Sequence, residues 1–527
     1  IITMKQKTKV LALLLAATMV AGAALTGCGT GDSNNSNSNS NTDNNSAAQG
    51  DAAKEDFTIA WASDLKSMDP HATNDSTSST IQYHIYSTLV AVDEEGNIVG
   101  DLAENWEASE DELTWTFKLK QGVKFHNGEE LKASDVKFSL DREKEGARTA
   151  YLVEKVDNIE VIDDYTVAVH LSQKDGSLLY SLAQAGSSIL NEKAVNEKGD
   201  KYADSPVGTG PMKLVEWVPN DHITLERFDD YYAGAAKAKT ITWRTIPEGS
   251  SRAIALENGE VDLVTGIDPI DVARTMENAN LKTELIASTG CEYLGFNFEK
   301  EPFNDVRVRQ AFAYAINKQN IVDVVFEGRG EIANSVVGSA IPGYDATVPG
   351  YEYNPEKAKE LLAEAGFPNG FKTTIKTSGD IRNRQAQLIQ ADLAAIGVEA
   401  EIELLDWGAY LEAINAGDME TYIISWSNST MDVSESLVPL FHSKNWGPTG
   451  NRMHYSNPEV DALLDELVAT SDKEARYEIG AKVQHIVGEE APWATLVCKY
   501  SCMGYQKDLK GVKIMPNENH RYENMYY

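Results

Sequence analysis

The sequence has few cysteines, few positive charges and no motif of a common enzyme class. Its 527 residues include four cysteines, and 47 Lys and Arg stand against 81 Asp and Glu, which gives a formal charge of −34 at pH 7. Such acidity argues against binding to nucleic acid or docking on anionic lipid, because both carry negative charge. The length is sufficient for two or three globular domains with substantial cores.

Catalytic and metal-binding motifs are missing. There is no HExxH, no Walker-type loop ending in Lys-Ser/Thr, no GxGxxG after a strand, no GxSxG and no EF-hand spacing. The nine histidines are scattered, and the adjacent acids Asp163-Asp164 and Asp229-Asp230 are typical of turns. We therefore predict no enzyme activity, no cofactor and no metal site. A secreted hydrolase with a carboxylate pair in a cleft remains a remote alternative.

The cysteines allow one disulfide at most. Cys28 lies in the N-terminal segment, which leaves Cys291, Cys498 and Cys502, so at least one thiol stays free. Cys498 and Cys502 fall in a segment, 494–502, whose pattern favours a strand. Buried apolar thiols are a better interpretation of this pair than a metal site, because free cysteine behaves as a small hydrophobe. Whether any two of the three pair is left open.

Residues 1–27 have the layout of an export signal. Three lysines precede an apolar run that ends at Leu25, which is too short and too rich in Gly and Ala for a membrane span. Leu25-Thr26-Gly27-Cys28 resembles the lipobox of bacterial lipoproteins, in which the cysteine is lipidated; an ordinary cleaved signal is the alternative. Residues 28–54 are rich in Asn and Ser, which predicts a disordered tether. We expect a protein anchored through Cys28 on the extracytoplasmic face of the cell membrane.

The hydrophobic pattern changes along the remaining chain. Up to about residue 296, alternating runs predict strands, with one hairpin formed by 114–119 and 123–126 and another by 159–162 and 166–171, while 81–92 predicts an amphipathic helix. After residue 297, strands alternate with helices of 10–15 residues, which predicts a largely parallel α/β lobe. Two lobes of different texture suggest a ligand held in the cleft between them.

Six stretches of the body carry a family resemblance. They are LKQGVKFHNG (119–128, continued to 142), GTGP (208–211), PFNDVRVRQA (302–311), YNP (353–355), YSNPEVD (455–461) and EAP (490–492). In order and spacing these stretches resemble family 5 of the bacterial extracellular solute-binding proteins. That family comprises the peptide, dipeptide and nickel receptors of ABC importers.

The resemblance implies a fold, a domain organisation and a role. The fold is α/β, a two-lobe periplasmic-binding-protein-like fold of type II, cluster C style, with an extra β-rich subdomain. Lobe I comprises 55–88, 197–296 and 489–527, the β-rich subdomain II comprises 89–196, and lobe III is continuous over 297–488. The implied role is that of a monomeric receptor that captures a short peptide between its lobes and delivers it to an ABC permease. The alternative is the same role for an oligosaccharide, a modified amino acid or a metal chelate.

The resemblance also implies ligand-binding residues. Peptide-binding members place an Asp, in a Trp-x-x-Asp segment, against the α-ammonium of the peptide. The matching segment here is Trp426-Ser427-Asn428-Ser429, so Ser429 stands at the Asp position and cannot neutralise an ammonium; Asp432 is a candidate replacement. The other implied contacts are the hydroxyls of Thr73, Ser76, Thr77 and Ser78 from the first lobe, Arg382 and Arg384 for a ligand carboxylate, and Asn451 and Arg452 as a second anion contact. Solvent-exposed arginines and a core tryptophan are the plain alternatives for Arg382, Arg384 and Trp426.

Overall fold

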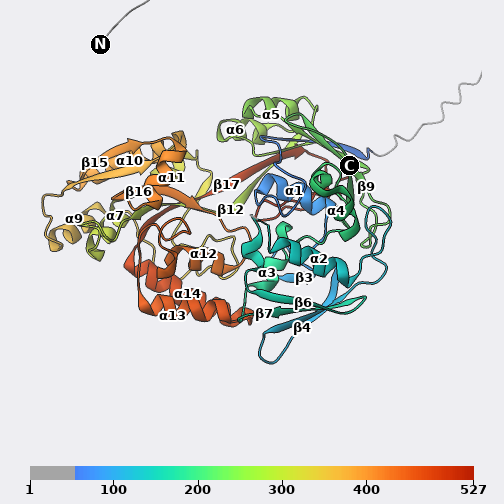
Figure 1. Ribbon diagram of the computed structural model, residues 1–527. Helices are drawn as coiled ribbons and strands as arrows, with labels where there is room; N and C mark the ends of the chain where they lie inside the picture. The colour runs from blue at the N-terminus through green and yellow to red at the C-terminus, as the bar shows by residue number, and fades with distance from the viewer. Residues whose placement is uncertain (1–53, 147) are drawn as a thin grey trace, which may run out of the picture. The chain divides into compact units, whose positions relative to one another are not determined.

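Short strands and two long ones build the body of the protein. The structure is a computed structural model that describes residues 54–146 and 148–527 (Figure 1); the predicted export signal and Cys28 lie outside these residues. The strands are β1 (Asp56–Trp61), β2 (Val90–Val92), β3 (Ile98–Gly100), β4 (Ala103–Ala108), β5 (Thr114–Leu119), β6 (Val156–Asp163), β7 (Thr166–Leu171), β8 (Met212–Val218), β9 (His222–Arg227), β10 (Thr240–Thr245), β11 (Leu263–Thr265), β12 (Leu281–Phe296), β13 (Gly330–Ile332), β14 (Lys372–Thr377), β15 (Glu399–Leu404), β16 (Thr421–Trp426) and β17 (Trp493–Gln506).

Several α-helices begin at side-chain caps that the sequence supplies. Asn354 and Asn457 each cap a helix that has a proline in its first turn. Proline is tolerated there because backbone N–H groups of the first turn have no partner within the helix. The helices are α1 (Ser76–Ile85), α2 (Ala133–Glu143), α3 (Leu178–Leu182), α4 (Glu192–Lys198), α5 (Gly249–Glu257), α6 (Pro269–Glu277), α7 (Val306–Ala315), α8 (Lys318–Val325), α9 (Pro355–Glu364), α10 (Asp380–Ala395), α11 (Trp407–Asn415), α12 (Val433–Phe441), α13 (Pro458–Ala469) and α14 (Lys473–Glu490). In the described part of the chain, no helix is both long enough and apolar enough to cross a membrane.

One large sheet runs through both ends of the body. Its order among the described residues is β15-β14-β16-β12-β17-β11-β1-β10-β9-β8, with β13 paired to β17, and a separate four-stranded sheet has the order β4-β5-β7-β6. Strands β15, β14 and β16 are parallel, whereas β12 and β17 form a long antiparallel pair. Figure 1 shows β12 and β17 crossing the centre of the body, between α10–α14 on one side and α1–α6 on the other.

Hydrophobic cores define two lobes. The first lobe comprises the elements packed around the core that includes Ile59, Phe117 and Trp243. The second lobe comprises the elements packed around two cores, one with Phe312 and one with Leu437. Strands of the predicted lobe I and of the predicted β-rich subdomain contribute to the same first core. The domain boundaries proposed from the sequence therefore stay a prediction.

Loops of the two lobes touch at a place that we call the rim. The backbone N–H of Gly176, after β7, donates to the carbonyl of Val468 in α13 at 2.8 Å. Ser471 donates to Glu112, and the Lys473 ammonium donates to the Asn97 side chain at 2.5 Å. Figure 1 shows α13 and α14 meeting the sheet of β4 and β7 at the end of the body away from the β12–β17 crossing.

The structure corrects two local predictions and confirms a third. The helix expected over 81–92 is α1, which ends at Ile85, and Val90–Val92 is a strand paired with β3. The hairpin of 114–119 with 123–126 is wrong, since β5 pairs with β4 and β7. The hairpin of β6 with β7 is confirmed.

Candidate ligand-binding site

The start of α1 supplies hydroxyls to a cavity in the first lobe. Asp75 caps this helix by accepting from the backbone N–H of Ser78 at 3.0 Å, and it also accepts from the hydroxyls of Thr73 and Ser78. The two hydroxyls are thus occupied in holding the turn. Ser76 and Thr77 instead line a cavity of about 200 Å³, together with Trp61 and Trp243.

A hairpin near the C-terminus forms another wall of this cavity. Lys513 and Arg521 exchange two backbone hydrogen bonds of 2.9 Å, and Glu518 at the tip has a positive φ of 65°. We call residues 513–521 the C-terminal hairpin. Glu518 and His520 face the cavity lined by Ser76 and Thr77. Sequence reasoning missed this wall, although the run of polar and aromatic residues from 517 to 524 was a usable signal.

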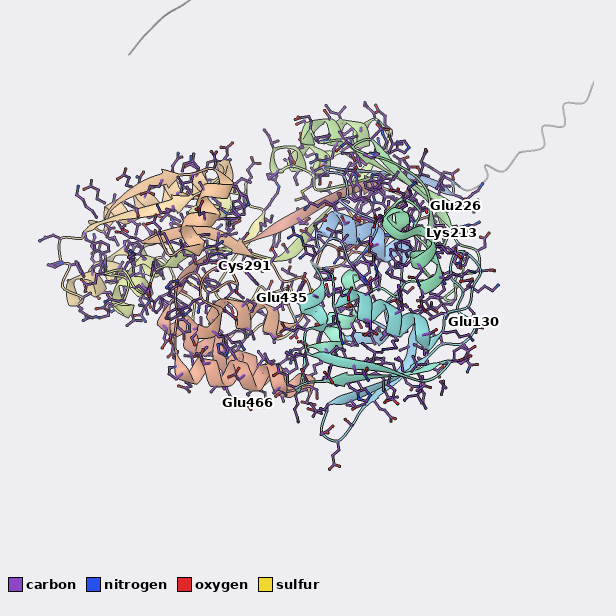
Figure 2. The ribbon with its side chains drawn as sticks, in the orientation of Figure 1. Glu130, Lys213, Glu226, Cys291, Glu435 and Glu466 are labelled. Carbon is purple, nitrogen blue, oxygen red and sulfur yellow. A yellow bond between two sulfur atoms is a disulfide. The ribbon has the colours of Figure 1, made fainter. Side chains whose placement is uncertain are left out.

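The loop after β16 in the second lobe is organised by Glu435, the third residue of α12. Its carboxylate accepts from the backbone N–H and hydroxyl of Ser429, at 2.9 and 2.8 Å, and from the same two groups of Thr430, at 2.7 Å each. Burial raises the pKa of Glu435, while these hydrogen bonds lower it. Figure 2 shows Glu435 on the side of α12 that is turned toward the first lobe. Trp426 donates its indole N–H to the backbone carbonyl of Glu435 at 3.0 Å.

Residues from both lobes converge on this loop. The side-chain amide of Asn517, in the C-terminal hairpin, donates to the backbone carbonyl of Ser429 at 3.1 Å. Burial raises the pKa of Tyr151, the negative charge of Glu435 raises it further, and a hydrogen bond with the Asn74 side chain lowers it. Tyr151 is 55% exposed. The negative charge of Glu435 thus acts on Tyr151 across the boundary between the two lobes.

The structure gives several predicted contact residues other partners. Asp432 caps α12, is 3% exposed and forms an ion pair with Arg476, so it is not free to replace an ammonium acceptor. Asn428 is buried and bonds to Asp432, Met431 and Ser436 within its own loop. Ser427 is exposed and lies beside Gly290 of β12.

The four remaining candidates also have partners within the second lobe. Arg382 pairs with Glu292 at 3.1 Å, and the exposed Arg384 donates to the carbonyl of Val324 at 2.7 Å. The buried Asn451 donates to two backbone carbonyls at 3.2 and 2.8 Å, and Arg452 donates to Asn415 at 2.8 Å. None of these four residues lines the cavity beside the C-terminal hairpin.

A disulfide joins the two long strands close to this site. Cys291 of β12 and Cys498 of β17 are directly opposite in the ladder and are bonded, and Cys502 is buried with a free thiol. The expectation of a buried thiol is wrong for Cys498 and correct for Cys502. Figure 2 shows Cys291 where the two lobes join. The pairing register of β12 and β17 shifts between Ala287 and Cys291, and pairing resumes at the disulfide-bonded residues Cys291 and Cys498.

The fold is that of a two-lobe binding protein, and Asn517 of the first lobe contacts the second-lobe loop that Glu435 organises. The family model described as bacterial extracellular solute-binding proteins, family 5 Middle, matches residues 97–448. The glutathione-binding protein GsiB of Escherichia coli (strain K12) is 33% identical over 485 residues, which cover 89% of this chain and 94% of the relative.

Solved structures with a similar fold support the same family assignment. The periplasmic binding protein DppA of Helicobacter pylori, in complex with the peptide STSA, has a TM-score of 0.75 at 33% identity and covers 90% of this chain and 98% of that one. The oligopeptide-binding protein AppA of Bacillus subtilis, in complex with a nonapeptide, has a TM-score of 0.72 at 28% identity and covers 90% and 99%. This chain belongs to family 5 of the bacterial extracellular solute-binding proteins. The predicted fold class is confirmed. The protein is an extracytoplasmic transport receptor that serves an ABC transporter, not an enzyme.

Proposed function

We propose that this protein captures a short peptide outside the cell and presents it to the permease of an ABC importer, as a monomer anchored in the membrane through a lipid on Cys28. The relatives named above bind a tetrapeptide, a nonapeptide and glutathione. The observation that carries the proposal is the hydrogen bond from Asn517 of the first lobe to the loop that Glu435 organises in the second.

Within this site, Glu435 is our candidate for the group that binds the peptide ammonium. Ser429 cannot carry the charge, and Asp432 is paired with Arg476. Two of the hydrogen bonds that Glu435 accepts come from Ser429 itself, so the carboxylate lies next to the position that the family motif assigns to Asp. One of its oxygens accepts only one of the four bonds, which leaves a lone pair for an ammonium N–H.

Mass spectrometry of ligand released from natively purified protein tests the function. We expect a small peptide, bound unaltered, that raises the melting temperature when it is added back. Recovery of a sugar, an opine-like amino acid or a metal chelate would replace the peptide proposal with the non-peptide alternative. Conversion of the ligand during incubation would contradict the assignment as a receptor.

Calorimetry with Glu435→Gln tests the ammonium contact. A hydrogen bond to a charged group contributes about 1.5–3 kcal/mol, so the variant should bind free-amine peptides roughly 10- to 150-fold more weakly. N-acetylation of the peptide should weaken binding to the wild-type protein by a similar factor and have no further effect on the variant. If acetylation weakens both proteins equally, the ammonium binds elsewhere. Thr430→Val is the matched control for loop order, because it removes one hydrogen bond to Glu435 and keeps the charge.

The anchor and the assembly state have simple tests. Expressed in a bacterium that processes lipoproteins, the full chain should partition with membranes, and Cys28→Ala should release it into the soluble extracytoplasmic fraction. Light scattering should give the mass of one chain. Membrane retention of the Cys28→Ala variant would refute the anchor.

A further inference from the structure

A second cavity lies on the other face of the C-terminal hairpin. It has a volume of about 130 Å³ and is bounded by the hairpin and by the β2–β3 pair. Residues at alternate positions of the hairpin divide between the two cavities: Asn517 and Asn519 line the second, whereas Glu518 and His520 line the first. The hairpin is therefore a partition between two neighbouring chambers. We call the second one the Tyr83 chamber.

Half of the residues that line the Tyr83 chamber are aromatic or aliphatic, and the other half are polar or charged. Tyr83 and Tyr231 contribute rings, and the Tyr83 hydroxyl donates to the carbonyl of Ala183 at 3.1 Å. Ala91 and Val99 are directly opposite each other in the β2–β3 ladder, so their side chains lie on one face, and both line the chamber. A cavity of about 150 Å³ with apolar walls holds one benzene ring, so a chamber of this size has room for one aromatic or branched side chain.

The charges around the chamber disfavour a cationic guest. Lys513 and Arg521 both line it. Arg521 pairs with Glu523 at 3.2 Å, whereas Lys513 has no ion-pair partner among the described residues. The carboxylate of Asp101 also lines the chamber, but it accepts from the backbone N–H of Thr88 at 3.0 Å and from the Tyr232 hydroxyl. A lysine or arginine side chain would thus meet two cations and a carboxylate that is already bonded.

Two polar atoms connect the chamber with the ligand site. Asn517 lines the chamber and donates to Ser429 of the second lobe, so the tip of the hairpin reaches the loop that holds Glu435. The Oδ1 atom of Asn519 is buried and accepts no hydrogen bond from any described residue. A buried acceptor without a donor is unfavourable, and a backbone N–H of an extended ligand passing over the hairpin would supply one.

We propose that the Tyr83 chamber is a specificity pocket that takes one apolar or aromatic side chain of the bound peptide, with the Oδ1 of Asn519 accepting a peptide N–H beside it. This inference rests on the proposed peptide-binding function. It assigns the side-chain selectivity of the receptor to the first lobe, behind the hairpin, while the second lobe binds the charged end.

Calorimetry with three sets of tripeptides tests the pocket: X-Ala-Ala, Ala-X-Ala and Ala-Ala-X, with Ala, Leu, Phe or Lys at X. Three sets are needed because the peptide position that enters the pocket is not fixed in advance. At one position we expect Leu or Phe to bind at least about tenfold more tightly than Ala, from burial of apolar surface, and Lys no more tightly than Ala. Val99→Trp, which fills the chamber, should abolish this preference, so that peptides with Leu, Phe or Ala at X bind with similar affinity.

Val215→Trp is the matched control, since Val215 is a 53% exposed valine on β8 and lines neither chamber. Melting curves verify folding, and Ala91→Leu is the second filling variant if Val99→Trp does not fold. Absence of binding by every peptide contradicts the proposed function itself. Binding without any preference at X, or a preference that survives a folded filling variant, overturns the specificity pocket alone.

Discussion

Gly176 offers a way to perturb the contact between the lobes at the rim. A methyl group at this position would lie 1.7 Å from the carbonyl oxygen of Thr470, whereas real Cβ atoms stay at least 3.0 Å from their neighbours. Gly176→Ala therefore requires the rim to move by more than 1 Å, which breaks the 2.8 Å hydrogen bond from Gly176 to Val468. Overpacking of this kind costs about 1–3 kcal/mol.

That cost falls on the form in which the lobes touch. A ligand that binds both lobes selects this form, so its affinity should fall by the corresponding factor, roughly 5- to 150-fold. Calorimetry with the tightest-binding peptide measures the change, and the melting temperature of the ligand-free variant should stay close to that of the wild type. Gly408→Ala is the control, because a methyl group there meets nothing within 4 Å. An unchanged dissociation constant for Gly176→Ala would refute the coupling of the rim to binding.

Two further perturbations test the cores and the crossing strands. Burial lowers the pKa of Lys318 from 10.5 to about 8. Between pH 8 and 10.5 the folded protein then holds fewer protons than the unfolded chain, and its stability rises with pH. At 1.36 kcal/mol per pH unit, Lys318→Met should be more stable than the wild type by about 3 kcal/mol at pH 7, and the difference in urea unfolding should vanish by pH 10.5; a constant difference would contradict a charged, buried Lys318. Cys291→Ala removes a disulfide that spans 207 residues and should cost about 2–5 kcal/mol in unfolding free energy, whereas Cys502→Ala, which removes a free thiol, should cost clearly less; equal losses would argue against the pairing.

Elements whose signal is local could be predicted from the sequence, and elements that depend on distant partners could not. The β6–β7 hairpin forms where the sequence predicts it, because its alternating pattern and its turn at Asp163-Asp164 are local signals. The helix expected over 81–92 ends at Ile85 because the backbone of Gly208 and Gly210 packs against it there: a methyl group on Gly208 would lie 2.1 Å from the Ile85 carbonyl oxygen. No local pattern encodes that contact.

The same division holds at the site. The start of α1 and the loop after β16 were found through family motifs, and both lie beside the converging residues. The sequence did not single out Glu435 or the C-terminal hairpin, since their place at the proposed site depends on contacts such as Asn517 with Ser429, 88 positions apart. Asp432 carries a carboxylate that could bind an ammonium, but Arg476, 44 positions away, pairs with it inside the second lobe.

The two ends of the interface between the lobes differ in strength, and this difference determines how the receptor can work. At the crossing, β12 and β17 form a long ladder with two register shifts, and a disulfide joins the two strands. At the rim, a few hydrogen bonds between loops contribute about 0.5–1.5 kcal/mol each. We therefore expect the lobes to separate at the rim while the crossing stays intact. Reversing a 99:1 preference for the open form requires about 5.5 kcal/mol. An ammonium on Glu435 at about 1.5–3 kcal/mol and a side chain buried in the Tyr83 chamber at about 1.5–3 kcal/mol together reach this magnitude, whereas either contact alone does not. A peptide that fills both sites should thus close the receptor, and one that lacks either should bind without closing it.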